Sequence, residues 1–123
     1  MNPIELVDAA QSVSEIPDRT LGASRYLAAV FLLRQALEDA LDRYWEAIEP
    51  GLEDCAGRIQ MVSLPAYLDD DSAARDVVYC WNRLSNASHH DAYELPPSQQ
   101  EFDHYLAVTR RSVECLSVGG GAR

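Results

Sequence analysis

One amphipathic pattern constrains this 123-residue chain more than any other feature. Between residues 24 and 48, apolar side chains recur every three or four positions, and Pro50 and Gly51 end the pattern. This spacing places them on one face of an α-helix, so the segment predicts a long helix with Ser24 as its N-cap. The predicted face consists of Tyr26, Val30, Leu33, Leu37, Ala40, Tyr44 and Ala47, widened by Leu27, Leu41 and Ile48.

Shorter stretches with helical period flank the long one. Residues 3–13 predict a first helix with Pro3 in its first turn. Proline is tolerated there because first-turn amides have no hydrogen-bond acceptor within the helix, so its missing N–H costs nothing. Residues 52–68 predict one or two short helices, because Gly57 and Pro65 interrupt the period.

Two more helices carry signals at their starts. The acidic run 69–71 provides an N-cap and places negative charge at the positive end of a helix over 72–88. After a predicted turn at 93–97, Ser98 and Glu101 form a capping box that opens the last helix. The two predicted stripes are Ala74, Val77, Trp81, Leu84 and Ser88, and then Phe102, Tyr105, Leu106, Thr109, Val113 and Leu116.

These elements fit one all-α domain. No alternation of period two supports a strand, so we expect a small antiparallel bundle of four to five helices. The expected organisation is a helix and linker over 1–20, a bundle over 21–117 and a flexible tail over 118–123. No apolar run is long enough to span a bilayer and no export signal is present, which predicts a cytoplasmic protein without a membrane partner.

The charge distribution and the cysteine content bear on whether the chain binds nucleic acid, a metal ion or a cofactor. The net charge is −10, but residues 1–71 hold 14 carboxylates and 5 arginines, whereas residues 72–123 hold 6 and 5. The second part therefore has room for a local basic site despite the acidic total. Cys55, Cys80 and Cys115 are odd in number and widely spaced, which predicts reduced thiols, no metal and no cofactor.

The stretch 81–94, WNRLSNASHHDAYE, has the residues best suited to chemistry. On a regular helix Tyr79, Arg83, Asn86 and His90 follow one another at spacings of four, three and four, so they form a polar stripe apart from the apolar one. His89 lies on a different side unless the helix end unwinds, in which case either histidine reaches Arg83. The alternative is a solvated helix end without a functional role. There the positive charges of Arg83 and the histidines are stabilised by the negative C-terminal end of the helix dipole.

An arginine beside a histidine suits cleavage of RNA by its own 2′-hydroxyl. An imidazole accepts or donates a proton near neutral pH, and a guanidinium holds two phosphate oxygens as charge develops. One histidine does not serve as both acid and base, but two copies related by a two-fold axis supply both. The long apolar stripe also leaves open a coiled-coil dimer seam.

The helical pattern, the segment AAVFLLRQAL at 28–37 and an arginine followed by a histidine after four to six residues resemble the HEPN (higher eukaryotes and prokaryotes nucleotide-binding) domain family. The likeness covers most of residues 21–116, and its R-x4-6-H motif maps onto Arg83 with His89 or His90. The resemblance implies a helical bundle, frequent homodimerisation and, in active members, metal-independent endoribonuclease activity, often in toxins or phage defence.

The resemblance also leaves a second function open. Catalytic members commonly have a polar residue after the arginine, whereas this chain has Leu84 on the predicted buried face. The alternative is a non-catalytic module that binds a protein or a nucleotide, with an antitoxin or a larger defence component as partner. An acidic antitoxin-like protein that masks a basic partner is a third reading.

Two further residues have competing interpretations, Arg34 and His104. Arg34 is placed to pair with Glu38 one turn later, or else to support Arg83 and contact RNA. His104 is interpreted as a surface histidine on the last helix. The candidate catalytic residues are therefore Arg83, His89 and His90, and the candidate RNA-binding residues are Tyr79, Asn86 and Arg34.

Overall fold

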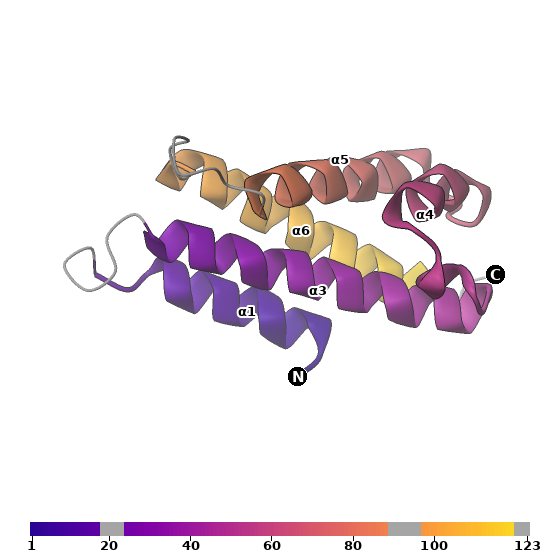
Figure 1. Cartoon of the computed structure of the whole chain (residues 1–123), viewed down its shortest axis with the longest axis horizontal. Helices are drawn as coiled ribbons and strands as arrows, with labels where there is room; N and C mark the ends of the chain where they lie inside the picture. The colour runs from indigo at the N-terminus through magenta and orange to yellow at the C-terminus, as the bar shows by residue number, and fades with distance from the viewer. Residues whose placement is uncertain (18–23, 89–96, 120–123) are drawn as a thin grey trace.

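The computed structural model describes residues 1–17, 24–88 and 97–119, and within these ranges it has five α-helices and no strand. The elements are α1 (Pro3–Ser14), α3 (Ser24–Ile48), the 3-10 turn η1 (Leu52–Asp54), α4 (Gly57–Ser63), the 3-10 turn η2 (Leu64–Ala66), α5 (Asp71–Ser88) and α6 (Gln99–Gly119). Successive long helices run in opposite directions (Figure 1). The prediction of a small antiparallel helical bundle is confirmed.

Helix α3 is the centre of the bundle and contacts α1, α5 and α6. Its bounds, Ser24–Ile48, are those predicted from the apolar period. Leu33 and Leu37 are fully buried, and each such side chain contributes roughly 1.5–3 kcal/mol through removal from water. The buried residues of α3 are Tyr26, Ala29, Val30, Leu33, Ala36, Leu37, Ala40, Leu41, Tyr44 and Trp45. The cap predicted at Ser24 involves a side chain outside the described part.

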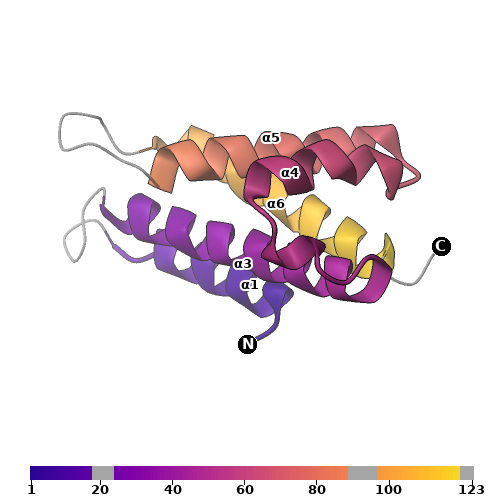
Figure 2. The ribbon, with the colours of Figure 1, turned by 45° about the vertical axis from the view of Figure 1, so that its right-hand side comes forward.

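Helix α1 packs along α3 (Figure 2). The Asn2 side chain accepts a hydrogen bond from the Glu5 amide at 2.8 Å, so Asn2 is the N-cap, and Pro3 follows it in the first turn. Arg110 of α6 donates to Asp8 of α1 at 2.9 Å, which ties these two helices across the surface.

The segment between α3 and α5 is irregular because it reverses the chain in short steps. Gly51, between the end of α3 at Ile48 and the start of η1, has a φ of 109°, a left-handed conformation that a side chain disfavours. Gly57 begins α4, and a Cβ at this position would overlap the indole ring of Trp81. Gln60 accepts a hydrogen bond from Trp45 Nε1 at 3.0 Å in the core.

The starts of α5 and α6 confirm the predicted caps. Asp70 accepts hydrogen bonds from the amides of Ser72 and Ala73 at 2.9 and 3.3 Å. Ser98 accepts from the Glu101 amide at 3.1 Å, and Glu101 accepts from the Ser98 amide at 3.2 Å, which is the reciprocal capping box.

Two boundaries differ from the sequence-based expectation or lie outside the structure. Helix α6 continues through Gly119, two residues into the predicted tail, since helix ends extend or fray without a strong stop signal. Most of the predicted turn at 93–97 and the linker residues 18–20 lie outside the described residues. No helix in the described ranges has the length and apolar character required to cross a membrane.

Candidate functional site

The predicted polar stripe occupies the outer side of α5. Arg83 and Asn86 are exposed and Tyr79 is half-buried, whereas Leu84 is 1% exposed and packs in the core. This split follows from the helical period, because Leu84 falls on the same side as Val77. His89 and His90 lie outside the described residues.

Arg83 and Tyr79 form the first contact of the site. The guanidinium carbon of Arg83 lies 5.5 Å from the centroid of the Tyr79 ring, one helical turn earlier. A cation over a phenol face is a favourable arrangement worth about 0.5–1 kcal/mol at an exposed position. Tyr79 therefore limits the directions in which Arg83 points.

The second contact joins α5 to α6. The imidazole of His104 meets the Tyr79 ring with centroids 5.7 Å apart and ring planes at 74°, an edge-to-face arrangement. Tyr79 thus contacts both a guanidinium and an imidazole. We call Tyr79, Arg83, His104 and the adjacent Tyr105 the Tyr79 cluster.

Tyr105 adds a phenol that remains protonated near neutrality. Its ring centroid lies 6.5 Å from that of His104. Burial raises the pKa of Tyr105, the Glu101 carboxylate raises it further, and the positive charge of Arg83 opposes these effects. A protonated phenol donates a hydrogen bond, so Tyr105 offers a neutral donor beside two basic side chains.

Arg83 has no carboxylate partner in the described part of the chain. Four others are paired: Arg34 with Glu38, Arg43 with Asp39, Arg110 with Asp8 and Arg111 with Asp76. Within the same ranges, Arg58, Arg75 and Arg83 have no carboxylate within ion-pair distance. An unpaired surface guanidinium is free to bind an external anion.

Arg34 forms the predicted ion pair on its own helix. Its Nε lies 3.0 Å from Glu38 Oε1, and both side chains are partly exposed. In the described ranges the polar contact of Arg34 is this one and not one with Arg83. Arg34 is therefore not part of the Tyr79 cluster.

His104 is the residue of the cluster that sequence reasoning missed. It is exposed, as a surface histidine was expected to be, but its neighbour is Tyr79 of the preceding helix. A usable signal exists in the chain: α5 and α6 are consecutive antiparallel helices, so residues at similar distances from their connection come side by side.

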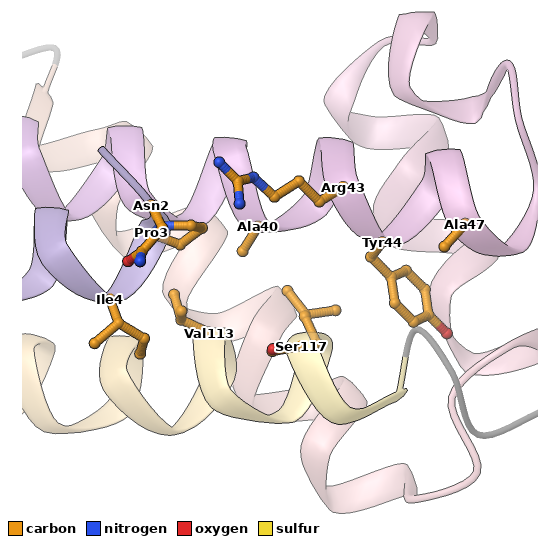
Figure 3. A pocket seen from close by; sticks show the side chains of 10 residues that line it. Asn2, Pro3, Ile4, Ala40, Arg43, Tyr44, Ala47, Val113 and Ser117 are labelled. Atoms are coloured by element: carbon orange, nitrogen blue, oxygen red, sulfur yellow. The ribbon is translucent and has the colours of Figure 1, made fainter.

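A separate hollow of about 420 Å³ lies between the start of α1, the second half of α3 and the end of α6 (Figure 3). Ala40, Tyr44 and Val113 belong to its wall, and Arg43, which lies 3.4 Å from Asp39, is another lining residue. No residue of the Tyr79 cluster lines it. In the described ranges no group of three or more histidine, cysteine or acidic side chains is placed to hold a metal ion.

Comparison with known proteins adds no family. No protein-family model, no curated protein and no solved structure matches the chain.

Proposed function

We propose that this chain is a HEPN-like protein that acts on RNA in the cytoplasm, as a metal-independent endoribonuclease of the toxin or phage-defence type. In this proposal Arg83 binds the scissile phosphate and His89 or His90 moves the proton. The observation that carries it is the position of Arg83, an exposed guanidinium without a carboxylate partner in the described ranges, held against Tyr79 beside the imidazole of His104.

The proposed reaction needs no group beyond side chains and the RNA itself. A base removes the proton of a ribose 2′-hydroxyl, whose oxygen attacks the adjacent phosphorus while the bond from phosphorus to the 5′-oxygen breaks. An acid gives a proton to that departing oxygen. The products are a 2′,3′-cyclic phosphate and a 5′-hydroxyl. Arg83 stabilises the charge that develops on the phosphoryl oxygens, an effect worth about 3–4 kcal/mol in comparable sites.

Two imidazoles are required if one is the base and the other the acid. We propose that a homodimer brings two copies of the motif together, so that each provides one histidine. His104 is a further imidazole next to the same Tyr79 ring, which makes it a candidate for the second role within one chain.

The remaining candidates have binding roles in this proposal. Tyr79 offers a ring face for a base, and stacking on an aromatic side chain contributes about 1–3 kcal/mol per base. Asn86 is exposed one turn after Arg83, where its amide can donate to a phosphate or a base edge.

Cleavage of a mixed RNA pool by the purified chain in the presence of a chelator tests the proposal. We expect cleavage by the wild type and a loss of about a hundredfold or more in the Arg83→Ala variant and in the double His89→Ala, His90→Ala variant. Arg43→Ala is the matched control, because Arg43 is an exposed arginine outside the site. An intact RNA pool at every pH tested contradicts the proposal, and so does equal cleavage by the Arg83→Ala variant.

The second candidate function is a non-catalytic HEPN-like module that binds a protein or nucleotide within a defence or regulatory system. The burial of Leu84 favours it, because the position after Arg83 faces the core and offers no second polar group to a substrate. Expression of the wild type in a host cell discriminates the two. A nuclease arrests growth and its Arg83→Ala variant does not, whereas a binding module has no such effect in either form.

A further inference from the structure

A groove runs between α4 and the outer side of α5, and Tyr79 is the one residue that its lining shares with the candidate nuclease site. It consists of two hollows of about 440 and 460 Å³ that share Val78. The first is lined by Pro65, Asp71, Ala74, Arg75, Val78 and Tyr79, and the second by Arg58, Met61, Val62, Val78, Trp81 and Asn82. We call these residues the α4–α5 groove. Figures 1 and 2 show α4 beside α5.

Apolar side chains are exposed at this groove. Val62, which lines the second hollow, is 77% exposed, and Ile59, one turn earlier on α4 but outside both sets of lining residues, is 52% exposed. Both lie on a helix held in place by the close approach of Gly57 to the Trp81 ring, so their exposure results from a fixed packing arrangement. Neighbouring exposed aliphatic side chains beside preformed hollows are typical of a surface that another protein covers.

Positive charge borders the same groove. Arg58 lines one hollow and Arg75 the other, and neither has a carboxylate within ion-pair distance in the described ranges. Asp71 is the one carboxylate among the lining residues, so the groove has a formal charge of +1 in a chain of −10. The groove therefore attracts an acidic partner.

The charges and the aliphatic wall together decide among the occupants. A two-fold contact between two copies of this groove brings two sets of Arg58 and Arg75 close together, which like-charge repulsion opposes. RNA satisfies the arginines but leaves Val62 against a hydrated phosphate backbone. A helix with apolar residues on one side and carboxylates beside them satisfies both features.

We propose that the α4–α5 groove binds an acidic amphipathic helix of a partner protein. Apolar side chains spaced three or four residues apart enter the two hollows on either side of Val78, and flanking Asp or Glu side chains pair with Arg58 and Arg75. The repeated apolar positions supply the affinity, and the charges set the preference for an acidic sequence.

Binding of defined synthetic peptides to the full chain tests this proposal. The probe is a fluorescent helical peptide of about 18 residues, with leucine at every third or fourth position and flanking glutamates. The control peptide has the same leucines, but lysines in place of the flanking glutamates. Fluorescence anisotropy is expected to show at least about tenfold tighter binding of the glutamate peptide.

Three variants locate the binding in the groove. The double Arg58→Glu, Arg75→Glu variant is expected to reverse the preference between the two peptides. Val62→Asp, at a position already exposed and therefore compatible with folding, is expected to weaken the glutamate peptide about tenfold or more. Arg43→Glu, remote from the groove, leaves both affinities unchanged.

Four results overturn the proposal. The first is failure of the glutamate peptide to bind, and the second is equal affinity for the two peptides. The third is self-association of the wild type that Val62→Asp abolishes, which identifies the groove as an interface between copies. The fourth is tight binding of a short single-stranded RNA that depends on Arg58 and Arg75, which makes the groove a nucleic-acid surface.

Discussion

Tyr79 of α5 and His104 of α6 meet edge to face, with ring centroids 5.7 Å apart and ring planes at 74°. Arg83 approaches the same phenol ring, with its guanidinium carbon 5.5 Å from the centroid. Residues 79 and 104 are far apart in sequence, so this contact exists only because α5 and α6 lie against each other. The Tyr79 ring therefore contacts both a guanidinium and an imidazole.

Replacing Tyr79 by leucine is expected to release both neighbours. The NMR signals of the His104 imidazole should shift, because the ring current of the phenol is lost, and stability should fall by about 1 kcal/mol. If the nuclease proposal holds, cleavage falls about tenfold through the disorder of Arg83. Tyr67→Leu is the control, since Tyr67 contacts Trp45 at another part of the bundle. Unchanged His104 signals in Tyr79→Leu contradict the contact.

Replacing Gly57 by alanine is expected to destabilise the fold by about 1–3 kcal/mol, because the new methyl group overlaps the indole of Trp81. Urea unfolding of Gly57→Ala measures this loss. In a Trp81→Leu background, where the indole is absent, the loss should shrink to a few tenths of a kcal/mol. Equal losses in the two backgrounds contradict a steric cause.

Gly51→Ala can be compared with Gly57→Ala, because at Gly51 an added Cβ causes no steric overlap. A Cβ at Gly51 meets no atom within 4 Å, but the φ of 109° disfavours any side chain. Gly51→Ala is therefore expected to lose about 1 kcal/mol or more through backbone strain, with the same loss in the Trp81→Leu background. A loss that depends on residue 81 contradicts that explanation.

Replacing Gln60 by leucine is expected to destabilise the fold by about 1–3 kcal/mol, because it leaves the indole N–H of Trp45 buried without an acceptor. The Gln60 amide also donates to the backbone carbonyls of Glu53 and Cys55 at 3.3 and 2.9 Å. Trp45→Phe leaves a cavity in either background, but because it also removes the unpaired indole donor, it should cost less stability in the Gln60→Leu background than in the wild type. If the stability losses of Gln60→Leu and Trp45→Phe are additive in the double variant, the unpaired indole N–H is not the cause.

The thiol of Cys80 is expected to make stability depend on alkaline pH. Burial raises the pKa of Cys80 above its ordinary value of 9.0, although hydrogen bonds with Thr109 and Ser112 partly oppose this. Below that value the thiol is protonated in both the folded and unfolded states. Above it, the unfolded thiol loses its proton while the folded one retains it, so stability falls by up to about 1.4 kcal/mol per pH unit.

Urea unfolding at about pH 8 and about pH 10 measures this effect. The wild type should lose more stability over the interval than Cys80→Ala, which shares every other titrating group. The comparison concerns the change with pH, since Cys80→Ala also removes buried atoms and lowers stability at both values. The same pH dependence in both proteins contradicts the raised pKa.

The long helices were predictable because their signals are local. The apolar period fixed the bounds of α3, and Asp70, Ser98 and Glu101 cap the starts of α5 and α6 as their positions in the sequence indicated. Capping and period act over one or two turns and need no knowledge of the tertiary arrangement.

The features that could not be predicted from the sequence depend on tertiary contacts. The sequence pattern indicates that Gly57 interrupts a helix, whereas in the structure Gly57 begins α4 and lies against Trp81. Gln60 is buried because Trp45 and two carbonyls satisfy its amide, and these partners are not adjacent in sequence. The partner of His104 likewise depends on the register between α5 and α6, which no local pattern encodes.

The most direct test compares cleavage of one short RNA with cleavage of the same RNA carrying a 2′-deoxy nucleotide at the cleaved position, both in the presence of a chelator. The 2′-deoxy RNA lacks the hydroxyl that attacks the phosphorus in the proposed reaction. The account predicts a 2′,3′-cyclic phosphate product from the unmodified RNA, none from the 2′-deoxy RNA, and about a hundredfold less product from the unmodified RNA with Arg83→Ala. Cleavage of the 2′-deoxy RNA, or product formation by Arg83→Ala at the wild-type rate, would show that this site does not cleave RNA in the way proposed.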